Sequence, residues 1–120
     1  MPSIFILDDI NDILLTLDLW LTRQGYEVYT FSNSKDLISA INFITPDFIL
    51  LDVRLAELKD GRVLCMELRH YHNYTNPIYL FSACSVMESD LLACGADGFI
   101  KKPFDLHRIL DIINHALVEL

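Results

Sequence analysis

Positive charge is scarce in this chain, which has 9 Lys and Arg residues against 17 Asp and Glu residues and a formal net charge of −8. Proteins that bind nucleic acid neutralise its phosphates with Lys and Arg, so the composition argues against direct nucleic-acid contact by this domain. No apolar run approaches the roughly 20 residues that a membrane-spanning helix needs. The apolar run at 4–7 is also shorter than the core of a signal peptide. We therefore expect no membrane association.

Cysteine and glycine are scarce as well. The 3 cysteines, Cys65, Cys84 and Cys94, form no C-x-x-C pair, which argues against a disulfide framework and favours the reducing cytoplasm. The 4 glycines form no glycine-rich phosphate loop, which weighs against a nucleotide-binding enzyme. Hydrophobic residues make up 52% of the chain, enough for a sizeable core, and no flexible linker or repeat interrupts it. We expect one domain over residues 1–120.

Short apolar runs alternate with segments of helical periodicity along the chain. The expected strands cover 4–7, 27–30, 48–51, 78–81 and 98–100. The expected helical segments cover 11–24, 34–44, 61–71, 87–94 and 105–120, with Ser34 and Asp105 as N-caps. Apolar runs without polar alternation are typical of strands that are covered on both faces, as in a parallel sheet. Helices joining such strands predict a three-layer α/β sandwich with right-handed crossovers.

Polar residues follow four of the expected strands. These residues are Asp8 and Asp9 after the first strand, Asp52 after the third, Ser82 after the fourth and Lys102 after the fifth. Parallel strands end at the same edge of a sheet, so we expect these side chains to converge. Neighbouring carboxylates repel one another unless a cation lies among them, and their oxygens favour Mg²⁺. A hydroxyl and an ammonium beside that ion suit a phosphoryl group, although each residue alone is more often a turn, a helix cap or a solvated side chain.

Five segments carry a family resemblance when they are taken together. They are ILDD at 6–9, ILLDV at 49–53, DG at 60–61, FSA at 81–83 and GADGFIKKPF at 95–104. With these segments the whole chain resembles the receiver domain of two-component response regulators, the phosphoacceptor half of bacterial signalling. The resemblance implies a flavodoxin-like α/β fold, a doubly wound five-stranded parallel sheet of order 2-1-3-4-5.

The resemblance also implies a role for each matching residue. Asp52 matches the phosphoacceptor, which takes a phosphoryl group from a sensor histidine kinase or a histidine phosphotransferase. Ser82 and Lys102 match the other catalytic residues, and Ser82 and Phe99 match the switch residues. The ligands of Mg²⁺ (or Mn²⁺) would be Asp8, Asp9, Asp52 and the backbone carbonyl of Arg54.

Departures from the family pattern lie near the phosphoacceptor and the switch hydroxyl. Leu55 and Ala56 replace the usual Met/Leu-Pro pair, and the loop that follows has one extra residue around 57–59. The stretch from Ser82 to the glycine at 95 is about two residues shorter than usual, so we expect a shortened fourth helix or a shortened loop before it. Arg54 and Cys84, each two residues past a site residue, match positions that tune the lifetime of the phosphoryl group. A solvated Arg54 is the alternative.

The first helical segment is unusually apolar. Its stripe, which is expected to face the sheet, consists of Ile10, Ile13, Leu14, Leu17 and Leu21. Leu15 and Leu19 point the other way, with Trp20 at the edge of the stripe. We interpret these three residues as a docking patch for the phosphodonor, and the alternative is that the leucines are simply exposed.

These observations predict a phosphorylation-activated switch that assists its own phosphorylation and is not an enzyme with an external product. The alternative is a degenerate receiver that acts as an interaction module without phosphate. A flavodoxin-like enzyme would need a cofactor loop that the sequence does not show. Formation of a homodimer on phosphorylation stays open, as does whether an effector domain follows Leu120 in the parent protein.

Overall fold

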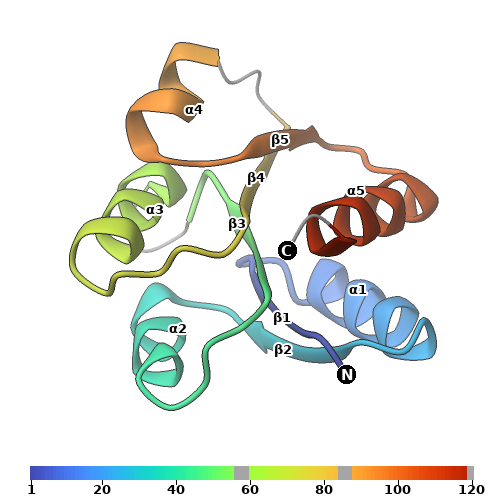
Figure 1. Ribbon diagram of the computed structural model, residues 1–120. Coiled ribbons are helices and arrows are strands. Elements are labelled where there is room, and N and C mark those ends of the chain that lie inside the picture. Colours follow the sequence, from blue (N-terminus) through green and yellow to red (C-terminus); the bar gives the residue numbers. More distant parts are fainter. Residues whose placement is uncertain (56–59, 84–87, 119–120) are drawn as a thin grey trace.

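A computed structural model describes residues 1–55, 60–83 and 88–118. Strands and helices alternate along the chain (Figure 1). The strands are β1 (Ser3–Leu7), β2 (Glu27–Phe31), β3 (Phe48–Asp52), β4 (Ile78–Ser82) and β5 (Gly98–Lys101). The helices are α1 (Asn11–Arg23), α2 (Ser34–Ile41), α3 (Gly61–His70), α4 (Glu88–Cys94) and α5 (Leu106–Val118). Within these ranges, each helix is too short or too polar to span a lipid bilayer.

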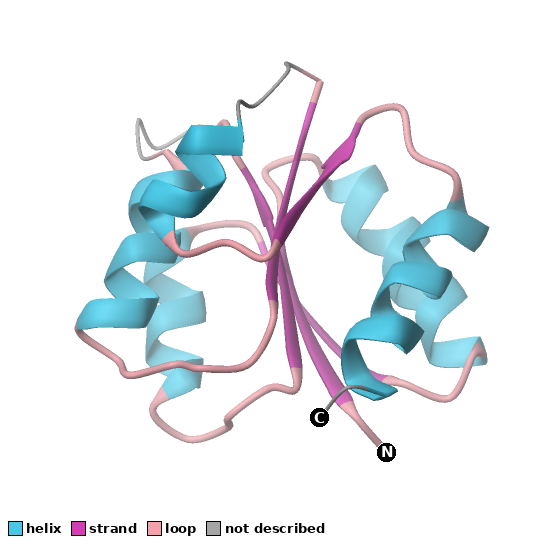
Figure 2. Ribbon diagram, turned by 45° about the horizontal axis from the view of Figure 1, so that its top comes forward, coloured by secondary structure: helices cyan, strands magenta, loops and turns pink. Residues whose placement is uncertain are grey.

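The strands form one sheet of order β2-β1-β3-β4-β5, and every neighbouring pair is parallel. Figure 2 shows the sheet nearly edge-on between two layers of helices. Helices α1 and α5 cover one face, while α2, α3 and α4 cover the other (Figure 1). The predicted three-layer fold and its strand order are confirmed.

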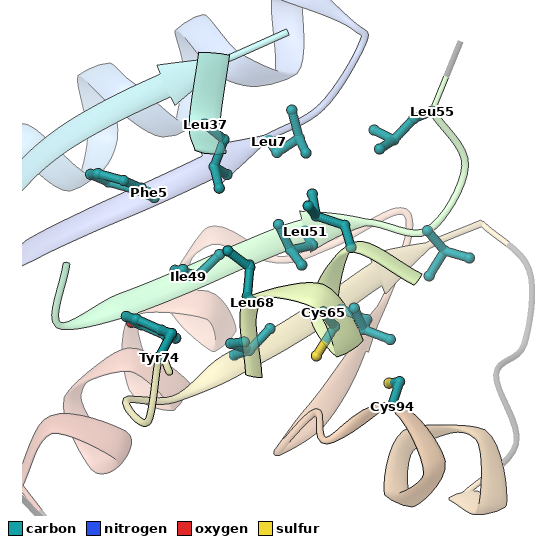
Figure 3. Packing of buried hydrophobic residues seen from close by; sticks show 14 residues of the cluster. Phe5, Leu7, Leu37, Ile49, Leu51, Leu55, Cys65, Leu68, Tyr74 and Cys94 are labelled. Carbon is teal, nitrogen blue, oxygen red and sulfur yellow. The ribbon is translucent and has the colours of Figure 1, made fainter. Parts of the chain in front are cut away.

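Burial on both faces explains the unbroken apolar runs. In β1, Phe5 and Leu7 point into the cluster beneath α2, α3 and α4, part of which is drawn in Figure 3. Ile4 and Ile6 point into the opposite cluster, beneath α1 and α5. All five residues of β3 are buried because β3 lies at the centre of the sheet. Residues 4–7 of β1 and 48–51 of β3 are therefore apolar without polar alternation.

Two details of the helices differ from the prediction. The N-cap of α2 is Asn33, whose side chain accepts a hydrogen bond from the Asp36 amide at 2.9 Å, so the prediction of Ser34 as the cap is wrong. Asn33 is extended, which turns its side chain toward the amides of the first helical turn, whereas Ser34 is already helical and buried. Ile10 is 49% exposed and wrongly assigned to the buried stripe, because it precedes α1 as its N-cap.

A close approach of two backbones fixes the start of α3 beside the end of β3. The Gly61 amide donates to the Val53 carbonyl at 2.8 Å. A Cβ atom at Gly61 would lie 2.1 Å from the carbonyl oxygen of Asp52, far inside van der Waals contact. Glycine is therefore required at this position by space, and the carbonyl that would have to move belongs to a candidate site residue.

We predict that Gly61→Ala lowers the free energy of unfolding by about 1–3 kcal/mol, because the added methyl group forces backbone atoms apart. Gly98→Ala is the matched control. The three atoms nearest to its Cβ atom would all belong to the Tyr79 ring, the closest at 2.4 Å, so the strain falls on a half-buried side chain and not on a backbone carbonyl. Urea denaturation of both variants measures the difference. A Gly61→Ala variant as stable as Gly98→Ala would contradict the prediction.

Candidate functional site

Three carboxylates meet where β1 and β3 end. Leu7 pairs with Leu51 in the sheet, so Asp8, which follows β1, and Asp52, the last residue of β3, lie at the same level. Asp8 is fully buried, Asp52 is 4% exposed and Asp9 is exposed. One oxygen from each of the three side chains lies within 4.8 Å of the others. The structure thus brings together the carboxylates that the sequence predicted to converge.

Each oxygen of the Asp8 carboxylate has its own partner. Oδ1 accepts a hydrogen bond from the Ile10 amide at 2.8 Å, which fixes the turn into α1. Oδ2 accepts one from the Lys102 ammonium, also at 2.8 Å. The Lys102 Nζ atom lies 3.6 Å from Asp52 Oδ2 and 4.5 Å from the centre of the Phe81 ring. The Lys102 ammonium therefore forms ion pairs with two buried carboxylates, those of Asp8 and Asp52, and the Asp9 carboxylate lies beside them.

The pairing of β4 with β5 positions Lys102 and Ser82 together. Ser82 pairs with Lys101, and the Lys102 amide donates to the Ser82 carbonyl at 2.9 Å. Ser82 is 2% exposed at the end of β4, the strand next to β3. Successive residues of a strand point to opposite sides, so Lys101 is exposed while Lys102 is largely buried beside the carboxylates.

Burial of Asp52 has a clear effect on its acidity. Loss of solvent and, next in size, the negative charge of Asp8 raise the pKa of Asp52 to about 6 from its ordinary value of 3.8. Lys102 and the Arg54 amide act in the opposite direction, and that amide lies 3.4 Å from Asp52 Oδ1. The attraction of Lys102 does not offset the burial and the repulsion. The metal-free site therefore disfavours the ionised form of Asp52.

Arg54 and Cys84 are the two positions that were predicted to tune the lifetime of the phosphoryl group, and the structure describes only Arg54. The Arg54 side chain is exposed, and its backbone forms an antiparallel bridge with Asp60. Cys84 and the insertion around 57–59 lie outside the described residues. The role of the Arg54 carbonyl as a metal ligand stays a prediction.

The remaining predicted residues lie away from the carboxylates. Phe99 is half-buried and packs against the cluster beneath α2, α3 and α4. Leu15 and Leu19 are 59% and 55% exposed on the outer side of α1. Trp20 is half-buried, and its ring meets the edge of the His107 ring of α5 at 5.2 Å. Trp20 is thus a contact between α1 and α5 at the margin of the exposed leucines.

An ion pair between Asp60 and Arg62 at the start of α3 was not predicted from the sequence. Asp60 caps α3 by accepting from the Arg62 amide at 2.8 Å, and the Arg62 guanidinium lies 2.6 Å from the same carboxylate. Arg62 also reaches Asp90 of α4 at 3.4 Å. Opposite charges two residues apart are common on any surface, so the sequence offered no signal for this link.

The donor set of the cluster restricts the ion that it could hold. Among the described residues, its ligand atoms are carboxylate oxygens, and no nitrogen or sulfur ligand joins them. Hard divalent cations such as Mg²⁺ prefer oxygen ligands, whereas zinc and copper sites usually contain imidazole or thiolate. The residues present therefore fit a hard divalent cation.

Comparison with known proteins agrees with this geometry. A family model for the response regulator receiver domain matches residues 4–114. A receiver domain protein from Methanospirillum hungatei superimposes with a TM-score of 0.90 at 26% identity, over 99% of this chain and 95% of that chain.

Two curated relatives are longer than this chain. Regulatory protein AtoC from Escherichia coli is 32% identical over 116 residues, which are 95% of this chain and 25% of that protein. Transcriptional regulatory protein AfsQ1 from Streptomyces coelicolor is 34% identical over 98% of this chain and 52% of that protein. The chain thus spans about a quarter to about half the length of these relatives.

We predict that Asp52→Asn stabilises the metal-free protein near neutral pH. Because the folded pKa of Asp52 is about 6 and its ordinary value is 3.8, ionisation opposes folding as the pH rises through this window. The variant cannot ionise, so its free energy of unfolding should exceed that of the parent by about 1–3 kcal/mol above the window. Below the window, at about pH 3, the difference should vanish.

Urea denaturation in a chelator, repeated across this pH range, measures the effect. Asp111→Asn, which changes an exposed carboxylate on α5, is the control and should show no such pH dependence. A difference that stays constant with pH, or a less stable Asp52→Asn variant at neutral pH, would count against the prediction.

Proposed function

The chain belongs to the response regulator receiver domain family, and we propose that it is a switch in which Asp52 accepts a phosphoryl group from a phosphohistidine donor. The observation that carries this proposal is the meeting of three carboxylates and one ammonium at the end of β3, with buried Ser82 on the neighbouring strand. Receiver domains are signalling modules. The change of state on phosphorylation, and not an external product, would be the output.

Each group in the cluster has a part in the proposed transfer. An oxygen of Asp52 attacks phosphorus and forms the new P–O bond while the P–N bond to the donor histidine breaks. The Lys102 ammonium, held by Asp8, lies near Asp52 and would stabilise negative charge on the transferring group. The Ser82 hydroxyl would bind a phosphoryl oxygen after transfer, and Phe99 would follow its movement.

The same carboxylates would hold a divalent cation. Asp8, Asp9 and Asp52, with the backbone carbonyl of Arg54, are the proposed ligands of Mg²⁺ or Mn²⁺. When bound, the ion supplies positive charge that shields the carboxylates from one another and from the phosphoryl oxygens. Oxygen donors within 4.8 Å of one another support this assignment.

The family implies a sensor histidine kinase or a histidine phosphotransferase as the phosphodonor. We propose that this donor docks beside α1, on Leu15 and Leu19 with Trp20 at the margin of the patch. Transfer from such a donor would occur in the cytoplasm. The relatives are named as regulatory proteins, so control of an output by phosphorylation of this chain is part of the proposal for the whole protein.

Acetyl phosphate with Mg²⁺ should add one phosphoryl group to the protein, detected by intact-mass spectrometry. Asp52→Asn should remove nearly all labelling because it deletes the nucleophile. The Asp111→Asn control should be labelled like the parent. Labelling of Asp52→Asn at the parental level would refute the assignment, and a parent that is never labelled would favour the phosphate-independent interaction module.

Arg54 should prolong the phosphorylated state. Its exposed side chain lies two residues past Asp52, where it is able to cover or pair with a phosphoryl group. Arg54→Ala should then lose its label about two- to fivefold faster after the donor is removed, as expected for loss of one exposed charge contact of up to about 1 kcal/mol. Arg54→Lys should fall between the two. An unchanged or slower rate in Arg54→Ala would contradict this role.

Leu15→Ser combined with Leu19→Ser should slow phosphoryl transfer from the cognate donor about tenfold or more, since buried apolar anchors dominate many interfaces. Labelling by acetyl phosphate should stay near normal because a small molecule needs no docking patch. Val63→Ser, which changes a 47% exposed residue on α3, is the control. Equal loss with both donors would indicate damage to the fold, and no loss with either would show that docking lies elsewhere.

A further inference from the structure

Two buried thiols meet between α3 and α4. Cys65 of α3 is fully buried, and Cys94, the last residue of α4, is 3% exposed. Both are free cysteines in the cluster beneath α2, α3 and α4. Figure 3 shows their sulfur atoms in the space between the two helices. The phosphoryl site uses neither residue.

The two thiols lie in the same buried cluster between α3 and α4. Burial, followed by the neighbouring Cys94, raises the pKa of Cys65 to about 12. The Cys94 thiol also donates to the Leu91 carbonyl at 3.5 Å. Protonated, buried thiols react slowly, so the pair is protected while α4 stays in contact with α3.

Polar links hold α4 against α3 on both sides of the thiol pair. Near the start of α4, Arg62 of α3 reaches Asp90 at 3.4 Å. Just past its end, Arg69 of α3 donates to the Gly95 carbonyl at 3.0 Å and pairs with Asp97 at 3.0 Å. Among the described elements, α4 packs chiefly on α3. Separation of this one interface would therefore expose both sulfur atoms at once.

We propose that Cys65 and Cys94 form a redox modification site, at which a peroxide converts the two thiols into an intramolecular disulfide that cross-links α4 to α3. Local opening of α4 would admit the oxidant. One thiolate attacks the peroxide and becomes a sulfenic acid, and the second thiol then displaces its oxygen as water. In total, two thiols lose two protons and two electrons, and one hydrogen peroxide molecule becomes two water molecules.

The position of both sulfur atoms between α3 and α4 distinguishes this pair from ordinary buried cysteines (Figure 3). A single buried cysteine behaves as a small apolar side chain and has no partner for a cross-link. Here the partner comes from another helix, 29 residues away along the chain (94 − 65), and both residues already belong to one packed cluster. A disulfide at this point would restrain α4, the helix that follows the Ser82 strand.

The test uses Cys84→Ser protein, in which Cys65 and Cys94 are the remaining cysteines. Hydrogen peroxide should lower the intact mass by two hydrogen atoms, and peptide mapping should find the Cys65–Cys94 cross-link. Dithiothreitol should reverse both changes. The same protein carrying Cys94→Ala, checked for folding by circular dichroism, should form no intramolecular cross-link. Peptide mapping of oxidised protein with all cysteines intact provides a second measurement free of substitutions.

Hydrogen exchange provides a second measurement, which oxidant would leave unchanged if the two cysteines only filled the core. In the oxidised protein, amides of α4 should exchange at least about tenfold more slowly than in the reduced protein, because the cross-link suppresses opening of the α3–α4 interface. Three outcomes would overturn the inference. They are oxygen added to one sulfur without pairing, a cross-link formed only between molecules, and free thiols that persist after an equal concentration of cysteine has been oxidised in the same tube.

Discussion

Lys102 donates to Asp8 and lies 3.6 Å from Asp52, so one ammonium faces three carboxylates at the end of β3. This excess of negative charge follows from the fold, because a parallel sheet brings the carboxyl ends of all its strands to one edge. Without another cation, burial and, next in size, repulsion by Asp8 raise the pKa of Asp52 to about 6. A divalent cation would relieve that repulsion and prepare the site for a phosphoryl group.

The surrounding structure holds these charges in position. Pairing of Leu7 with Leu51 places Asp8, just past β1, at the level of Asp52, the last residue of β3. The Lys102 amide is tied to the Ser82 carbonyl, so the ammonium and the hydroxyl belong to one hydrogen-bonded unit. On the far side of Asp52, Gly61 allows α3 to begin in contact with its carbonyl. Movement of any of these backbones would therefore reach the carboxylate that is proposed to react.

The sequence predicted the strands because burial on both faces leaves an unbroken apolar run, and it predicted the edge residues because strand order aligns them. It failed where neighbouring residues compete, as with Asn33 and Ser34 for the cap of α2. It also failed where contacts join distant segments. Trp20 packs on His107, and Cys65 and Cys94 belong to one buried cluster, yet no periodicity or spacing marks either pair. Such contacts depend on how helices pack, which a single sequence does not encode locally.

The most direct test of the charge imbalance is to locate the cation with Mn²⁺, whose paramagnetism broadens nearby NMR signals. At low Mn²⁺, we expect the amides that follow the three carboxylates, those of Asp9, Ile10 and Val53, to broaden first, and excess Mg²⁺ to reverse the change. Asp52→Asn should weaken the broadening. Broadening centred on another acidic surface, such as that around Asp36, or spread evenly over the protein, would contradict the account.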